Sequence, residues 1–109
     1  MAEKKLVTIA VKEPSKPWEI RSVSNDLKSY QDIVGGFIEH FGGLHGAELF
    51  CNEDGIMKEL KFNIYFRGYP IFGNIFAVLP DEDDFSSLTD EQAGYFTNLG
   101  SQTLYLDRE

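Results

Sequence analysis

The clearest strand signal in this chain is the stretch Phe72-Gly73-Asn74-Ile75-Phe76-Ala77-Val78-Leu79. A short apolar run bounded by turn residues is typical of a buried strand, so we predict such a strand over these residues. The wider apolar region from Phe62 to Leu79 is interrupted by polar residues, glycines and a proline. A membrane-spanning helix needs about 20 nearly uninterrupted apolar residues. The region therefore predicts a protein core and no membrane contact.

Further strands are expected on either side of this one. Lys4–Lys12 is rich in β-branched residues, and Trp18–Val23 alternates apolar and polar side chains, so the two segments predict a hairpin. Residues 56–71 fit either a helical turn or an extended segment. Three more strands are predicted over residues 37–41, 47–51 and, at an edge, 102–106. Loops are expected over residues 42–46 and 80–87, the second of them acidic.

Two short helices should pack on this sheet. The first begins at Ser24-Asn25-Asp26 and stops at Gly35-Gly36, because glycine takes the left-handed conformation at a helix end at little cost. The second covers about residues 90–98, where Thr89-Asp90-Glu91-Gln92 has the pattern of a capping box. The faces expected to point inward carry Leu27, Tyr30, Ile33 and Val34 in the first helix, and Ala93, Phe96 and Leu99 in the second. Residues 1–109 are therefore predicted to form one α+β domain with a mostly antiparallel sheet of about five strands.

Composition and charge exclude several classes of protein. The chain has 109 residues, 42% of them hydrophobic, which is enough for a core, and one Cys, which excludes an internal disulfide. The formal net charge is −8, so the chain should repel nucleic acid. Its N-terminal apolar run is too short for a signal peptide. We expect a cytoplasmic protein that contacts neither membrane nor nucleic acid directly.

Four segments, taken in order along the chain, carry a family resemblance. They are Leu27–Glu39, Cys51–Gly55, Asn63 ahead of Ile71–Asn74, and Phe85–Glu91. With them the chain resembles the phage and bacterial family of mobile elements known as domain of unknown function 3846, a likeness that spans roughly residues 6 to 96. The resemblance implies a phage or mobile-element origin, and hence a bacterial host cell, and assigns no activity.

The charge is concentrated near the C-terminus, where residues 81–109 hold eight acidic side chains and one arginine. Acids in this density can imitate nucleic acid phosphates and occupy the basic channel of a nuclease. The alternative to phosphate mimicry is a solvated loop followed by a helix whose first turn is acidic, as is common at helix N-termini. The acids expected to bind a partner are Asp81, Glu82, Asp83, Asp84, Asp90 and Glu91.

An aromatic segment is another candidate site. Gly68 and Pro70 indicate a loop here, so the side chains around them could anchor a protein interface, including one between copies of this chain. Packing in the core is the alternative. The proposed anchors are Tyr65, Phe66, Arg67 and Tyr69.

His40, His45 and Cys51 form the third candidate site, because imidazole and thiolate are preferred ligands of zinc. On a hairpin, His40 and Cys51 could come to lie opposite each other, and an acid or a second subunit would have to complete the site. The alternative is a small buried Cys51 with two solvent-facing histidines. No cofactor is otherwise expected.

The chain has no phosphate-binding loop or nucleophile motif, so we predict no enzymatic activity. The function expected is that of an inhibitor which blocks a basic surface on a host nucleic-acid enzyme, such as a CRISPR nuclease. Two alternatives stay open, namely a zinc-binding domain, which is compatible with inhibition, and a structural or regulatory subunit.

Overall fold

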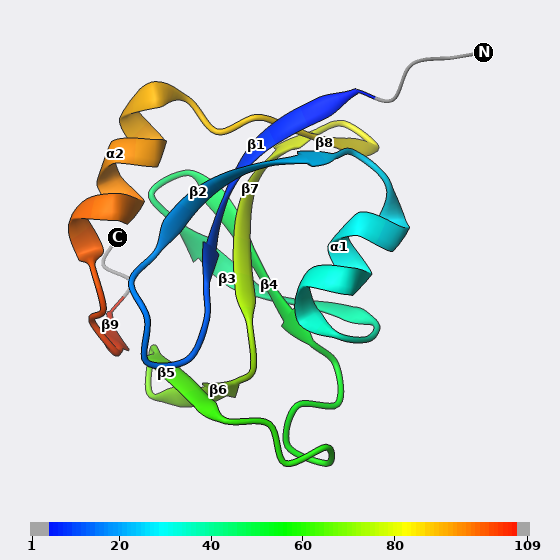
Figure 1. The fold of residues 1–109 in the computed structure, drawn as a ribbon. Coiled ribbons are helices and arrows are strands. Elements are labelled where there is room, and N and C mark those ends of the chain that lie inside the picture. The colour runs from blue at the N-terminus through cyan, green and yellow to red at the C-terminus, as the bar shows by residue number, and fades with distance from the viewer. Residues whose placement is uncertain (1–4, 107–109) are drawn as a thin grey trace.

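A computed structural model describes residues 5–106 of the chain. Figure 1 shows that the two helices lie on opposite flanks of the strands. In chain order the elements of this part are β1 (Leu6–Lys12), β2 (Glu19–Ser24), α1 (Leu27–Val34), β3 (Ile38–Leu44), β4 (Ala47–Asn52), β5 (Phe62–Phe66), β6 (Tyr69–Phe72), β7 (Ile75–Asp81), β8 (Asp84–Ser86), α2 (Asp90–Leu99) and β9 (Leu104–Tyr105).

The strands form two sheets. The larger has the order β2-β1-β7-β4-β3, with β8 attached to β7, and all its pairs are antiparallel. The smaller has the order β6-β5-β9, in which β9 runs parallel to β5. The α+β class and the β1–β2 hairpin are confirmed, but residues 5–106 hold nine strands in two sheets, where about five in one sheet were expected.

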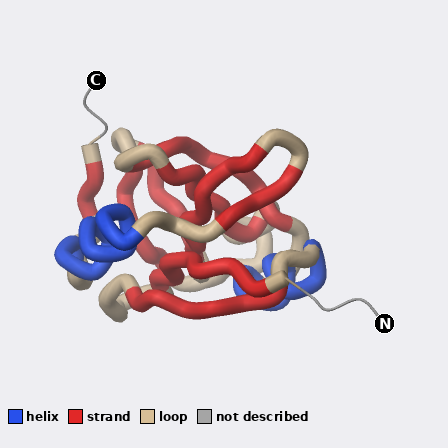
Figure 2. The backbone as a smooth tube through the Cα atoms, turned by 90° about the horizontal axis from the view of Figure 1, so that it is seen from above, coloured by secondary structure: helices blue, strands red, loops and turns tan. Residues whose placement is uncertain are grey.

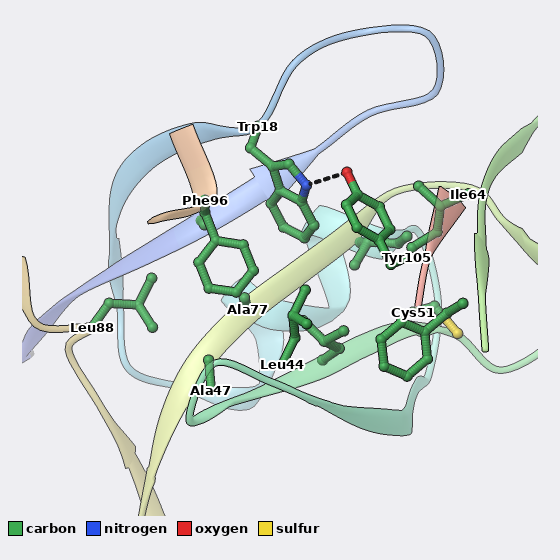
Figure 3. Packing of buried hydrophobic residues seen from close by; sticks show 13 residues of the cluster. Trp18, Leu44, Ala47, Cys51, Ile64, Ala77, Leu88, Phe96 and Tyr105 are labelled. Atoms are coloured by element: carbon green, nitrogen blue, oxygen red, sulfur yellow. Dashed lines mark hydrogen bonds between the residues drawn. The ribbon is translucent and has the colours of Figure 1, made fainter. Parts of the chain in front are cut away.

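The central strand β7 separates two hydrophobic clusters, because its side chains alternate between the faces of the larger sheet. Phe76 and Val78 belong to a cluster covered by α1 through Tyr30 and Val34. Ile75 and Ala77 belong to the other cluster, which α2 and the smaller sheet cover. Figure 2 shows the helices on either side of the strands, and Figure 3 shows the second cluster. Its other labelled members are Trp18, Leu44, Ala47, Cys51, Ile64, Leu88, Phe96 and Tyr105.

Both predicted helices are confirmed with their caps. Asp26 accepts a hydrogen bond from the Ser29 amide at the start of α1, and Gly35 ends the helix with a φ of 80°. In α2, Thr89 and Gln92 form the expected capping box. One residue of the predicted inner faces differs, since Leu27 is 60% exposed.

Several boundaries differ from the predictions. Strand β3 continues through Gly42 and Gly43, which were expected in a loop, and the chain turns at His45-Gly46 instead. The strand expected over residues 72–79 begins later, at Ile75, because Phe72 belongs to β6. The tail strand is shorter than predicted, and Lys4, where the first strand was expected to begin, lies outside the described residues.

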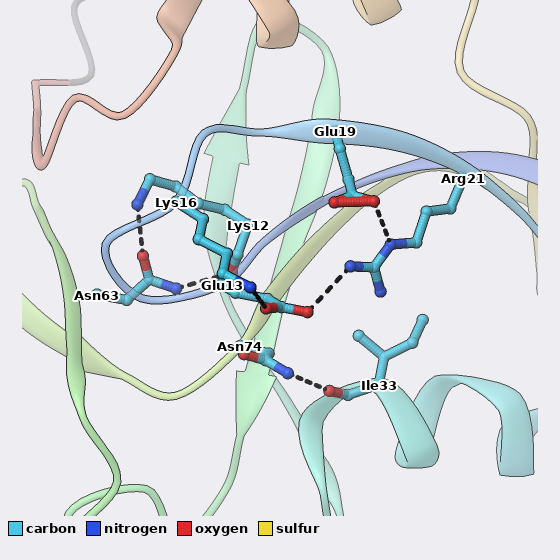
Figure 4. Close-up of polar contacts among 8 residues, drawn as sticks. All are labelled: Lys12, Glu13, Lys16, Glu19, Arg21, Ile33, Asn63 and Asn74. Atoms are coloured by element: carbon cyan, nitrogen blue, oxygen red, sulfur yellow. Dashed lines mark hydrogen bonds and ion pairs between the residues drawn. The ribbon is translucent and has the colours of Figure 1, made fainter.

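A buried polar contact joins the two sheets (Figure 4). The Lys12 ammonium donates to Asn63 Oδ1 at 2.9 Å, and Asn63 Nδ2 donates to the carbonyls of Lys12 and Gly73. Because Lys12 is fully buried, desolvation lowers its pKa. Asn63 therefore ties β5 to β1 and to the turn before β7.

Within residues 5–106, no helix combines the length and the apolar character that a membrane crossing requires.

Candidate functional site

The segment expected to be an acidic loop is a hairpin. β7 extends to Asp81 and pairs with β8, so that Asp81 lies opposite Asp84 and Glu82-Asp83 forms the turn. Glu82 takes a φ of 52°, which lets so tight a turn close. All four acids are exposed because the hairpin projects past the core. The core strand β7 thus fixes their position, whereas a free loop would not.

Next to this hairpin the surface is hollowed into an open groove of about 680 Å³. It lies between the hairpin, the start of α1 and the strands β3 and β4. Apolar side chains line the groove together with five carboxylates and one histidine. The lining residues are Asn25, Asp26, Leu27, Tyr30, Ile38, His40, Glu48, Phe50, Pro80, Glu82, Asp83, Asp84 and Phe85.

Aromatic rings form the floor of the groove. The ring of Phe85 lies 5.1 Å from that of Phe50 and 5.0 Å from that of Tyr30, which it meets edge-on. Both Phe50 and Tyr30 stack on Phe76 of the central strand, at 5.2 and 5.1 Å. Because Phe76 is fully buried, the floor is anchored to the core.

Hydrogen bonds attach the start of α1 to the hairpin. Asn25 Nδ2 donates to the Phe85 carbonyl at 3.0 Å, and the Tyr30 hydroxyl donates to Asn25 Oδ1 at 2.6 Å. Burial, with the nearby carboxylates of Asp84 and Asp26, raises the pKa of Tyr30 to about 12. Tyr30 is therefore a neutral donor under physiological conditions, in surroundings that disfavour additional negative charge.

The predicted acidic residues are divided between two places. Asp90 and Glu91 occupy the first turn of α2, on the flank opposite α1 (Figure 1). Glu91 lies 3.6 Å from His45 Nε2, and the ring of His45 stacks on Tyr95 at 4.0 Å. Glu82, Asp83 and Asp84 line the groove, whereas Asp90 and Glu91 do not.

The aromatic segment is also a hairpin and not a loop. Its strands β5 and β6 meet at Arg67-Gly68, at the end of the molecule remote from β8 (Figure 1). Tyr65 and Tyr69 are exposed, but Phe66 is 2% exposed and contacts Phe41 in the core. Phe66 is therefore not available as an anchor, because the alternation of β5 turns it inward. The structure does not bring these residues together with the acidic hairpin.

The structure separates the three residues expected to bind zinc. Cys51 lies opposite Glu39 and belongs to the cluster on the α2 face, whereas His40 lies opposite Phe50 and contacts its ring on the α1 face. His40 Nε2 contacts a carboxylate oxygen of Glu48, and His45 lies in the turn. Over residues 5–106, no three His, Cys, Asp or Glu side chains are grouped so that they could hold a metal ion.

The state of the Cys51 thiol also disfavours metal binding. Burial, with a smaller contribution from the charge of Glu39, raises its pKa to about 12. Zinc binds the thiolate, which this environment opposes.

The sequence did not reveal the aromatic floor. Tyr30 was assigned to the core, and Phe50 and Phe85 were assigned no role. One signal was available, because Phe85 is the only aromatic residue directly after four consecutive acids. This signal is weak, because a single apolar residue sets no period from which a packed strand can be predicted.

The structure is that of a small α+β protein with a groove lined by aromatic and acidic side chains. A family model described as domain of unknown function (DUF3846) matches residues 7–101, so the chain belongs to that family. This confirms the resemblance noted in the sequence. A search of curated proteins and a search of solved structures each found no match.

Proposed function

We propose that this protein is a non-enzymatic inhibitor from a phage or mobile element that acts in the bacterial cytoplasm. It binds a basic surface on a host nucleic-acid enzyme, with a CRISPR nuclease or a similar defence effector as the leading candidate. The observation that carries the proposal is the β7–β8 hairpin, which presents four exposed acids in succession beside the groove.

The electrostatics of the hairpin suit this role. In the part of the chain that the structure describes, neither lysine nor arginine forms an ion pair with Asp81, Glu82, Asp83 or Asp84. Their charge is thus available to a partner. A negative surface attracts a basic one, speeds the encounter and excludes the phosphates that the basic surface would otherwise bind.

A catalytic role has less support. The thiol of Cys51 is buried and its pKa is raised, which opposes formation of the nucleophilic thiolate. We therefore assign the activity to binding. Tyr65, Arg67 and Tyr69 offer a second contact region, at the far end of the molecule, for a partner large enough to reach it.

Charge reversal in the hairpin turn tests the proposal. The assay measures DNA cleavage by purified host nucleases, CRISPR effectors among them, at increasing inhibitor concentration. We expect E82K/D83K to raise the half-inhibitory concentration at least about tenfold, because two attractive charges become repulsive. E53K/E59K is the matched control, since it makes the same charge change in another exposed turn, and Glu59, like Glu82, has a positive φ.

The control variant should inhibit within about twofold of the native protein. Equal loss of inhibition in both variants would mean that only bulk charge matters. Undiminished inhibition by E82K/D83K would contradict the proposal directly.

A further inference from the structure

We propose that the groove between α1 and the β7–β8 hairpin binds an arginine side chain from a basic segment of the partner protein. This inference rests on the proposed function and deepens it, because it names the group that the site recognises. The groove joins an aromatic floor to an acidic rim, and a guanidinium group complements both.

The floor offers the surface on which a guanidinium stacks. Phe50 and Phe85 are half-buried, so part of each ring is open to the groove, and their planes meet at 55°. Tyr30 and Phe76 hold these rings from behind. A preformed aromatic surface attracts a cation through the negative face of the ring.

The rim supplies charge of the opposite sign. Glu82, Asp83 and Asp84 line the groove on the hairpin side, and Glu48 lines it on the β4 side. Among the described lining residues there is neither lysine nor arginine. The one histidine, His40, is already paired with Glu48. A cation that enters the groove therefore meets the exposed carboxylates of the hairpin, whereas Glu48 already contacts His40.

The shape of the site favours arginine over other cations. The carboxylates do not converge, since the described residues contain no cluster that could hold a metal ion. A lysine ammonium is compact and strongly hydrated, whereas a guanidinium is planar, stacks on rings and pairs with carboxylates through two hydrogen bonds. The open groove of about 680 Å³ also leaves room for the residues that flank the arginine.

Peptide binding to the intact protein tests this inference. The probes are a fluorescent oligo-arginine peptide and an oligo-lysine peptide of equal length, measured by anisotropy. We expect the arginine peptide to bind roughly five- to tenfold more tightly, and F85L to remove most of that difference. F62L is the matched control, because Phe62 is a part-exposed aromatic residue of β5 outside the groove.

A second measurement keeps the inference testable if F85L does not fold. In the native protein, the arginine peptide should shift the NMR amide signals of residues 25–30, 48–50 and 82–85. Equal affinity for both peptides in native protein and F85L would overturn the inference, as would shifts confined to other residues.

The inference and the proposed function can fail separately. If the peptides do not distinguish F85L while E82K/D83K still relieves nuclease inhibition, the groove is not an arginine site and the inhibitor remains. If the arginine peptide binds the groove as expected but no nuclease is inhibited, the proposed function fails.

Discussion

The position of Cys51 on its strand determines the burial and the pKa of its thiol. Its neighbours Phe50 and Asn52 point to the other face of the sheet, so the thiol faces the cluster that α2 covers and is only 6% exposed. A thiolate there would lose much of its hydration, and this burial, with the charge of Glu39, raises the pKa of Cys51 to about 12. At neutral pH the side chain behaves as a small apolar group.

Alkylation of Cys51 should therefore be slow. Only the thiolate reacts with the reagent. The raised pKa lowers the fraction of Cys51 present as thiolate, and burial restricts access of the reagent to the sulfur. We expect iodoacetamide at pH 8 to modify the native protein at least about 100-fold more slowly than the protein unfolded in guanidinium. Mass spectrometry of timed samples measures both rates. Comparable rates in the two states would show that Cys51 is accessible and its thiolate easily formed.

At the scale of elements, local chemistry predicted the helices well. The N-cap and C-cap of α1 and the capping box of α2 depend on residues within one turn of each helix end, so the sequence alone identifies them. The β1–β2 hairpin was predictable for the same reason, since the β-branched residues of β1 and the alternation over residues 18–23 are local patterns.

The remaining elements depend on distant contacts. Gly42 and Gly43 suggested a loop, yet β3 passes through them. A Cβ atom at Gly42 would come within 2.5 Å of the Phe66 ring, so the glycine allows the two sheets to approach each other there. That approach of two sheets is not visible in the local sequence. The acids at 81–84 likewise suggested a loop, whereas they belong to a hairpin. Its strand β8 is held in place by Phe85, which packs on Tyr30. The groove arises from these long-range contacts, so its floor could not be predicted.

The capping box of α2 gives a prediction at this scale. Thr89→Ala removes the hydroxyl that accepts from the Gln92 amide at 3.1 Å. We expect a loss of about 1 kcal/mol in the free energy of unfolding, measured by urea denaturation. Thr97→Ala is the control, because Thr97 lies exposed in the same helix, and its cost should stay within about 0.5 kcal/mol. Equal costs would mean that the box does not stabilise the helix.

At the scale of the whole molecule, the net charge of −8 is unevenly placed. Residues 81–109 carry a formal charge of −7, and the fold divides it between the hairpin and the first turn of α2, while Asp107 and Glu109 lie outside the described residues. Of the described acids in this part of the chain, Glu82, Asp83 and Asp84 line the groove. The molecule thus has one end suited to a basic partner, and the exposed tyrosines of β5 and β6 lie at the other end (Figure 1).

Hydrogen–deuterium exchange on the complex with an inhibited nuclease tests most directly which end binds. We expect slower exchange, relative to the free protein, in residues 80–86 and 25–30, with residues 65–70 changed less. Protection confined to residues 65–70, with the hairpin and the start of α1 unchanged, would contradict it.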